Sequence, residues 1–528
     1  MRLTALAICF IFISGVVGAG LFQPQFSIDP SGVINAEGLD VIFCSYFGGT
    51  GEEWSNDIYY CSDGSIVLTG MTRSSDLPIV NASQEAYGGE GDVFIVKLNP
   101  QFEVEFYTYF GGSGLEEPMA LTVDYYDNII VAGGTSSDDL PLLSPIQEQL
   151  NGSSDAFLAK FTRNGTLIFS TYLGGSELDR IEDICYSANG DYVVVGITES
   201  TNFYTTPGAY QESFGGGNTD VFITSISIVN HSIVFSTFFG NTTDDDAWAI
   251  GIDKSLDLVI VGMTNGASIA TDSAYQQTYG GGSTDCFVAK FSSDCSSLYW
   301  ATLLGGNGWE FGDQVEFDWK NNIIVSGYTG SSDFPLIQQT QNDTAGYDAF
   351  FTILNAAGEN LLISSYLGGN FEDRSYAMEV MDSGGIMITL PSASTDMPTN
   401  NPFQSNNNGG SDGYIAFLYD LTESETLNVT FGSYFGGTSN DYVLGMSIRV
   451  HNSVDVAVIG YTSSEDLPTL GAIQDVYGGG ISDTMVWIFS VQFSAPDLSP
   501  ISPVEIAIIL TILLAIPIII YSWLRRGR

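Results

Sequence analysis

Acidic loops that contain tryptophan are the segments of this chain best suited to recognise a ligand. Three consecutive aspartates stand just before Trp248, two glutamates precede Trp54, and a glutamate follows Trp309. Carboxylates beside an aromatic ring suit a sugar, or a ligand bridged by calcium. The alternative is a solvated acidic surface in which each tryptophan wedges between neighbouring structural units. The ligand-binding residues predicted from this pattern are Trp54, Asp244, Asp245, Asp246, Trp248 and Trp309.

A second series of aspartates recurs just before segments that resemble DVFIVKL, usually after a glycine-rich turn. Its members are Asp92, Asp155, Asp220, Asp285, Asp348, Asp412 and Asp483. One aspartate per repeat would suit calcium, but the chain has no D-x-[DN]-x-[DN]-G-x5-E loop. An aspartate at this place more often accepts N–H bonds from the turn, so we predict a structural role. We predict no bound cofactor, with calcium left open. Three lysines five residues further on are also expected to be structural: Lys97, Lys160 and Lys290.

Residues for catalysis or for a metal centre are scarce. The two histidines, His231 and His451, fall in predicted hairpin turns far apart in the chain, so neither can pair with a nucleophile or form a metal cluster. The six cysteines are scattered without a C-x-x-C pair, which makes a zinc site improbable. We therefore predict no catalytic and no metal-binding residues.

The chain is organised by a motif typified by STYLGG, which occurs seven times at a spacing of roughly 65 residues. The first glycine of each copy is Gly48, Gly111, Gly174, Gly240, Gly305, Gly368 or Gly436. Each repeat contains four short apolar segments separated by turn residues, which predicts four strands. Four such strands cannot bury a core alone and must pack against their neighbours. The sequence therefore predicts an all-β, seven-bladed β-propeller of four-stranded blades.

The chain also resembles a known repeat family. STYLGGS (170–176), LTVDYYDNIIVAG (121–133) and DAFLAKF (155–161) are similar to the SBBP repeat, as are three D-[LF]-P elements that end near residues 141, 335 and 468. The resemblance covers about residues 40–490. It implies a seven-bladed propeller and an extracellular setting, and it implies no defined activity. Two repeats depart from the pattern, with ESTNFY and NGASIA in place of the D-[LF]-P element.

The two ends of the chain predict export and membrane attachment. Residues 1–19 have the basic start, apolar run and small-residue end of a secretory signal peptide, with an uncleaved anchor as the alternative. Residues 504–524 are apolar over a length that spans a bilayer, and the basic tail at 525–528 is expected to stay cytoplasmic. A sorting signal that is replaced by a lipid anchor is the alternative. Between these lie a leader (20–38), the propeller (39–493) and a proline-rich spacer (494–503).

Charge and glycosylation motifs agree with an extracellular place. Lys and Arg number 14 against 62 Asp and Glu, a net charge of −48, and such a field repels nucleic acid. Seven N-x-[ST] sequons are candidate glycan sites in an exported protein. Their asparagines are Asn81, Asn151, Asn164, Asn230, Asn241, Asn342 and Asn428.

From these features we expect a single-pass cell-surface protein with its propeller outside and its C-terminus in the cytoplasm. Its expected role is non-catalytic binding, adhesion or scaffolding toward an extracellular protein or glycan; the alternative is an extracellular polysaccharide hydrolase or lyase. The strand order of propellers further predicts that residues 39–47 complete the last blade and close the ring. Both longer sets of loops are then expected on the face opposite the one where the chain leaves the propeller.

Overall fold

A computed structural model describes residues 39–492, except 188–189, 228, 267–268, 340, 342–345, 382–383, 421–426 and 452. The predicted signal peptide, leader, spacer, transmembrane helix and basic tail lie outside the described residues. Within them, no helix has the length and apolar character needed to cross a membrane.

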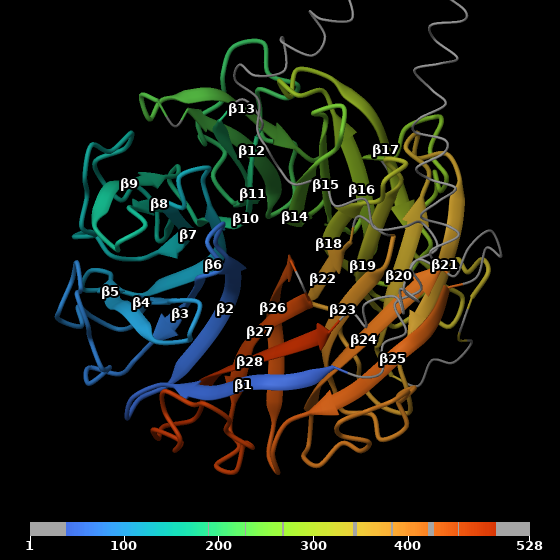
Figure 1. The fold of residues 1–528 in the computed structure, drawn as a ribbon. Helices are drawn as coiled ribbons and strands as arrows, with labels where there is room; N and C mark the ends of the chain where they lie inside the picture. Colours follow the sequence, from blue (N-terminus) through green and yellow to red (C-terminus); the bar gives the residue numbers. More distant parts are fainter. Residues whose placement is uncertain are drawn as a thin grey trace, which may run out of the picture.

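Seven four-stranded antiparallel sheets form a ring (Figure 1). Blade 1 contains β2 (Glu53–Tyr60), β3 (Ile66–Thr72), β4 (Asp92–Leu98) and β5 (Val104–Phe110). Blade 2 contains β6 (Glu116–Val123), β7 (Ile129–Thr135), β8 (Asp155–Phe161) and β9 (Leu167–Leu173). Blade 3 contains β10 (Asp179–Tyr186), β11 (Asp191–Thr198), β12 (Asp220–Ser227) and β13 (Ile233–Phe239). Blade 4 contains β14 (Asp245–Ile252), β15 (Leu258–Thr264), β16 (Asp285–Phe291) and β17 (Leu298–Leu304).

The remaining blades follow the same order. Blade 5 contains β18 (Glu310–Phe317), β19 (Ile323–Thr329), β20 (Asp348–Leu354) and β21 (Leu361–Leu367). Blade 6 contains β22 (Ala377–Val380), β23 (Ile386–Ser392), β24 (Asp412–Asp420) and β25 (Leu427–Phe435). Blade 7 contains β26 (Asp441–Val450), β27 (Ser453–Thr462), β28 (Asp483–Gln492) and the first strand of the chain, β1 (Asp40–Phe47). The seven-bladed fold predicted from the repeat is confirmed.

The two ends of the described chain close the ring. β1 pairs antiparallel with β28, with Cys44 opposite Trp487, so the blue and the red strand lie side by side in Figure 1. β1 is thus the outermost strand of blade 7 and leaves no gap between the first and last repeats. This confirms the predicted closure, which covers the edge of β28 that would otherwise present unpaired N–H and C=O groups.

The hydrophobic core lies between blades as much as within them. The third strands β4, β8 and β16 are buried along their whole length, because each sheet is covered on both faces by its neighbours. Phe110 of blade 1, for example, packs on Phe157 of blade 2, with ring centroids 5.9 Å apart. A single blade could not bury these side chains, which is why the period of the sequence had to produce a closed ring.

Strand directions place the loops on two faces. The loop after the STYLGG-type motif leads into the innermost strand, and antiparallel pairing returns the end of the second strand to the same face, here called the upper face. The short turns between first and second strands, and the end of β28 at Gln492, lie on the lower face. The chain therefore leaves the propeller on the lower face, as the sequence predicts.

The long loops that start with D-[LF]-P do not stay on the upper face, which corrects the expectation stated above. They run back along the outermost strand: Val80 exchanges two backbone hydrogen bonds with Tyr107 of β5, and Leu470 does so with Cys44 of β1. The physical reason is that the outermost strand has a free edge, and the loop pairs with part of it. The loops that follow the STYLGG-type motif remain on the upper face.

The D-[LF]-P element is held by hydrogen bonds to the tyrosine of the STYLGG-type motif. The Tyr172 hydroxyl donates to Ser137 O at 2.6 Å and accepts from Leu140 N at 3.1 Å, and Leu140 belongs to the element. Blades 3 and 4, whose loops contain ESTNFY and NGASIA, have Phe238 and Leu303 in place of this tyrosine. The two departures from the repeat pattern are therefore one change, because the element and the hydroxyl that holds it are lost together.

The aspartates before the third strands serve the turn, as predicted. Asp92 accepts hydrogen bonds from Gly88 N at 2.9 Å, Gly89 N at 3.2 Å and Gln84 Nε2 at 3.0 Å. Glycines of the turns in five other blades donate in the same way to Asp155, Asp220, Asp285, Asp412 and Asp483.

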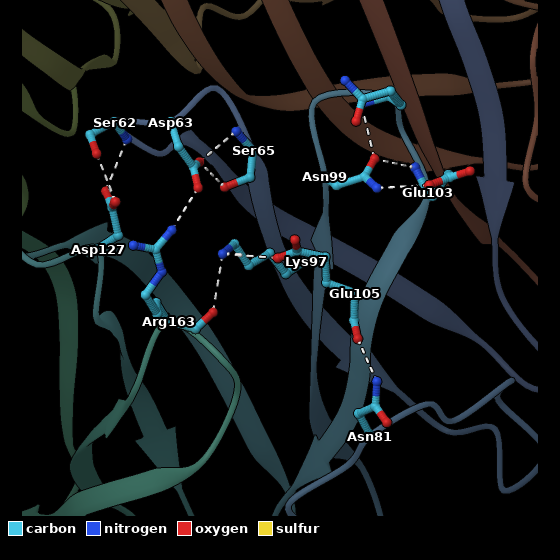
Figure 2. Close-up of polar contacts among 11 residues, drawn as sticks. Ser62, Asp63, Ser65, Asn81, Lys97, Asn99, Glu103, Glu105, Asp127 and Arg163 are labelled. Atoms are coloured by element: carbon cyan, nitrogen blue, oxygen red, sulfur yellow. Dashed lines mark hydrogen bonds and ion pairs between the residues drawn. The ribbon is translucent and has the colours of Figure 1, made fainter.

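The predicted structural role of the lysines is also confirmed, at the lower face. Lys97 is buried, donates to Arg163 O at 3.1 Å and forms an ion pair with Glu105 at 3.0 Å (Figure 2). Arg163 reaches back from blade 2 to Asp63 of blade 1 at 2.7 Å. Figure 2 thus shows polar contacts that tie the lower turns of two blades together, while the other two lysines pair with aspartates of their own blades at 2.9 and 2.6 Å.

Candidate functional site on the innermost strands

A carboxylate at the start of each innermost strand, or in blade 6 four residues before β22, holds the loop that precedes it. Glu116 is buried, accepts from Gly112 N at 2.8 Å and accepts from the Thr135 hydroxyl at 2.6 Å. We call the seven equivalent residues the latch carboxylates: Glu53, Glu116, Asp179, Asp245, Glu310, Asp373 and Asp441. All seven accept the N–H at the second glycine position of the motif, so their role is to fix the upper loops.

The first and third residues after each latch carboxylate form a different set, which we call the inner belt. Its members are Trp54, Asn56, Glu117, Met119, Arg180, Glu182, Asp246, Trp248, Phe311, Asp313, Arg374, Tyr376, Tyr442 and Leu444. Most of them are partly exposed, whereas the latch carboxylates and the residues two positions after them are buried. Because the innermost strands surround the axis of the ring, the backbone of the belt lies close to that axis, toward the upper ends of these strands (Figure 1).

Aromatic rings line the belt across blades 4, 5 and 6. Trp248 packs on Phe311 with ring centroids 5.3 Å apart, and Phe311 stacks on Tyr328 of β19 at 4.7 Å. Tyr328 also contacts Tyr376 of the next blade, and the Arg374 guanidinium lies over the Tyr328 ring at 5.2 Å. Burial raises the pKa of the Tyr376 hydroxyl, and the nearby Asp313 carboxylate adds to this effect.

The same row of rings continues through blade 7 to blade 1. Tyr442 stacks on Tyr461 of β27 with centroids 5.0 Å apart, and Tyr461 stacks on Trp54 at 5.9 Å. Trp54 remains 46% exposed despite this contact. We call the rings from Trp248 to Trp54 the aromatic arc; it covers more than half of the belt.

The belt on blades 2 to 4 carries a cluster of charged side chains. Arg180 donates through Nε to Glu182 Oε1 at 2.6 Å, and its Nη1 lies 3.9 Å from Glu117 Oε2. Burial raises the pKa of Glu182 to about 7, against the opposing effect of Arg180. Burial also raises the pKa of Asp246, against the effect of the neighbouring Thr219 hydroxyl. We call Glu117, Arg180, Glu182 and Asp246 the acidic quarter.

Carboxylates deeper along the innermost strands connect neighbouring blades. Asp57 accepts from Leu121 N of blade 2 at 3.0 Å, and Asp183 accepts from Ile250 N of blade 4 at 2.8 Å. Burial raises the pKa of each carboxyl to about 7. These groups satisfy N–H groups that would otherwise be unpaired at the inner edge of the sheets, and we count them with the fold.

The structure separates the three consecutive aspartates predicted as ligand residues. Asp244 accepts from Asn218 N at 2.6 Å in the upper loops, and Asp245 is the buried latch carboxylate of blade 4. Only Asp246 lies on the belt, where Trp248 follows it and Trp54 completes the arc. Trp54, Asp246 and Trp248 are thus brought onto one belt although almost 200 residues separate the first from the others.

Trp309 stands beside the belt rather than on it. It precedes the latch carboxylate of blade 5, is 47% exposed, and contacts Tyr347, which in turn contacts Tyr328 of the arc. Most of the belt gives no signal in the sequence, because its positions carry different residues in different blades. The unpredicted members that carry charge or a ring are Glu117, Arg180, Glu182, Phe311, Asp313, Arg374, Tyr376 and Tyr442.

The candidate glycosylation sites differ in access. Asn81, Asn151, Asn164 and Asn230 are exposed in loops and turns. Asn241 lies in the loop that is held by the latch carboxylate Asp245. Its Nδ2 is buried without a hydrogen-bond partner, so this amide is not accessible to glycosylation in the folded chain. Asn342 and the side chain of Asn428 lie outside the described residues.

Metal ligands do not converge in the part of the chain that the structure describes. There, no three Asp, Glu, His or Cys side chains are arranged to hold an ion. The calcium alternative therefore has no set of ligands among these residues.

Comparison with known proteins assigns this chain to no family. No family model matches the chain, and no curated protein sequence matches it. Among solved structures, a protein of unknown function from Dyadobacter fermentans aligns over 86% of this chain and 100% of its own, with 9% identity and a TM-score of 0.41. The β-propeller domain of the trilobed protease from Pyrococcus furiosus aligns over 85% and 98%, with 8% identity and a TM-score of 0.37.

The phage phi92 endosialidase aligns over 87% of this chain and 70% of its own, with 10% identity and a TM-score of 0.36. Similarities of this size say nothing about what this protein binds or whether it catalyses a reaction. The function must be argued from the belt itself.

Proposed function

We propose that this protein is a non-catalytic binding module of the cell surface, and that its inner belt binds a carbohydrate. The observation that carries the proposal is the aromatic arc, a row of partly exposed rings on blades 4 to 7 and on blade 1. Trp54 and Trp309 are nearly half exposed on the upper side, and both contact further rings that belong to the arc or lie beside it. Large exposed rings beside a few polar groups are typical of a ligand site.

A sugar fits this surface because it has an apolar face and a polar edge. The apolar face can lie on a tryptophan or tyrosine ring, and hydroxyls at the edge can donate to carboxylates such as Asp246 and Glu117. The rings belong to successive blades, so an oligosaccharide could contact several of them at once. The rigid ring supports the site, since each belt residue follows a latch carboxylate held by the fold.

Export and membrane attachment remain part of the proposal, supported by the two ends of the sequence. The chain leaves the propeller on the lower face at Gln492, and the spacer of residues 494–503 would reach about 30 Å at most. The belt opens on the upper side and would face away from the membrane. Protease added to whole cells should release the propeller while a tag placed after Arg528 stays intact; a protected propeller would overturn this arrangement.

Membership of the SBBP repeat family is likewise proposed. It is supported by the recurrence of the quoted motifs, and each motif has a physical role in the ring. The glycines and tyrosine of STYLGG meet a latch carboxylate and the D-[LF]-P element, and the aspartate of DAFLAKF caps a turn.

The test is a binding screen of residues 20–503 against oligosaccharides, with and without a chelator. The triple variant Trp54→Ala, Trp248→Ala, Trp309→Ala should weaken a positive result by about 100-fold, because hot-spot aromatic residues dominate such sites. Trp319→Ala is the matched control: Trp319 is 63% exposed but stands in a turn of the lower face, so binding should not change. Binding that survives the triple change would refute the belt as the site.

The same panel tests the alternative, an extracellular polysaccharide hydrolase or lyase. Shortened products after long incubation with the wild-type ectodomain, and none with the triple variant, would favour that alternative. Unchanged oligosaccharides that nevertheless bind would favour the module.

A further inference from the structure

The acidic quarter of the belt points to the charge of the ligand. Resting on the carbohydrate function proposed above, we propose that the belt selects an oligosaccharide that carries free amino groups, such as an oligomer of glucosamine. Neutral N-acetylated and acidic oligosaccharides should bind less well.

The first argument is the balance of charge within the acidic quarter. Arg180 is its only cation, and it stands against Glu117, Glu182 and Asp246. Three acidic side chains beside one guanidinium leave a deficit of positive charge when they are ionised. An ammonium group on the ligand would correct that deficit, whereas a carboxylate on the ligand would enlarge it.

The second argument is an oxygen that has no donor. The Glu182 side chain is 1% exposed, and while Oε1 accepts from Arg180, Oε2 has no hydrogen-bond partner. Asp246 is 9% exposed, and the only donor beside its carboxyl among the described residues is the Thr219 hydroxyl. A buried carboxylate oxygen without a donor is costly, so a donor from the ligand, direct or through a water molecule, would stabilise the site. Ammonium groups offer three donors and the matching charge.

The third argument is that the aromatic arc already accommodates a cation. The Arg374 guanidinium lies 5.2 Å from the Tyr328 ring centroid and 5.3 Å from that of Tyr347. The faces of such rings attract cations. Trp248 of the arc is two residues from Asp246 on the same strand, so a ligand on that ring would lie close to the acidic quarter. The net charge of −48 adds a long-range attraction for cations.

A basic peptide shares the charge but fits the arc less well. The arc consists of flat rings distributed over successive blades, which suits repeated sugar rings better than a chain with long flexible side chains. A lysine-rich peptide is therefore one arm of the test.

The experiment measures the affinity of residues 20–503 for four probes of matched length. They are a glucosamine tetramer, its N-acetylated form, a tetramer of galacturonic acid and tetralysine. The amino tetramer should bind about tenfold more tightly than the acetylated one, the galacturonate least, and tetralysine no better than the acetylated sugar.

Single-charge variants separate recognition from general attraction. Glu182→Gln and Glu117→Gln should each reduce the preference for the amino tetramer and leave the affinity for the acetylated one unchanged. Glu105→Gln on the lower face is the control, because it changes the net charge equally and should preserve the preference. Glu117, which is 43% exposed, keeps the test informative if the buried Glu182 variant fails to fold.

Each outcome has one meaning. If the acetylated or acidic tetramer binds as well as the amino tetramer, the charge inference is wrong while the carbohydrate function stands. If none of the sugars binds, both fail. If tetralysine binds best, the ligand is a basic peptide and both are overturned. If Glu105→Gln lowers the preference as much as Glu117→Gln does, the attraction is unspecific and the acidic quarter is not the site.

Discussion

Two neighbouring positions on the innermost strands behave in opposite ways. The latch position is a carboxylate in all seven blades, and it accepts the same hydrogen bond from the loop before it. The residue that follows it is different almost every time: Trp54, Glu117, Arg180, Asp246, Phe311, Arg374 and Tyr442. Adjacent residues of the chain thus belong to two different regions, the latch carboxylates and the inner belt.

The difference shows what repetition is for in this ring. Closing seven blades requires one loop geometry seven times, so the residue that holds the loop is repeated. A single axis has one ligand surface, to which each blade contributes once, so the residue that faces it has no reason to repeat. The latch carboxylates, which repeat in every blade, are therefore expected to control stability. The inner belt, which differs between blades, is expected to control binding.

The largest effect on the stability of the ring is expected from deletion of residues 39–47, which include β1. Without β1, the edge of β28 is exposed and blade 7 has three strands. We expect loss of the cooperative melting transition and aggregation of the ectodomain. Differential scanning calorimetry and light scattering would show it. A deleted chain that melts at the same temperature as the intact one would contradict the closure.

A matched pair of glutamates separates the two positions directly. Glu116→Ala removes a latch carboxylate and leaves Gly112 N and the Thr135 hydroxyl without their acceptor. It should lower the free energy of unfolding by about 3 kcal/mol.

Glu117→Ala, one residue later and 43% exposed, should change stability by less than about 0.5 kcal/mol. Guanidinium denaturation of both variants measures this. Equal losses from the two glutamates would remove the distinction between latch and belt.

Acidity should change the stability of both regions in one direction. Burial raises the pKa of latch carboxylates such as Asp179, Asp373 and Asp441 to about 6, and that of Glu182 on the belt to about 7. The folded chain therefore holds more protons than the unfolded chain between these values and about pH 4, and stability must fall as pH rises through this window.

The melting temperature should accordingly be higher at pH 5 than at pH 8. Carboxyls with a lowered pKa, such as Asp124 and Asp455, do not oppose this trend, since they are still ionised at pH 5. A higher melting temperature at pH 8 would show that the buried acids are not protonated as described.

The sequence predicted the ring better than the site, and the reason is physical. The period, the strand pattern and the turn residues recur seven times, so an error in one repeat is corrected by the others. The belt occurs once and depends on which side of an irregular strand each residue occupies. Tryptophan beside acidic residues is a visible sequence signal, so Trp54 and Trp248 can be predicted. Asp245 shares that signal although it is buried, because burial cannot be read from a single sequence. Glu182 and Tyr442 carry no such signal.

The prediction with the smallest expected effect asks whether the tyrosine of the STYLGG-type motif and the D-[LF]-P element depend on each other. Tyr172→Phe removes the hydroxyl that accepts from Leu140 N and donates to Ser137 O in blade 2. It should cost about 1 kcal/mol of unfolding free energy, since one buried N–H and one C=O lose a partner. Blade 3 already has Phe238 at the equivalent position, and its loop lacks the D-[LF]-P element. Phe238→Tyr should therefore not raise the free energy of unfolding, because the new hydroxyl has no such element to bond. Denaturation of the two variants in parallel measures both. If Phe238→Tyr stabilised the chain by as much as Tyr172→Phe destabilises it, tyrosine and element would be independent, and the joint departure of blades 3 and 4 would need another cause.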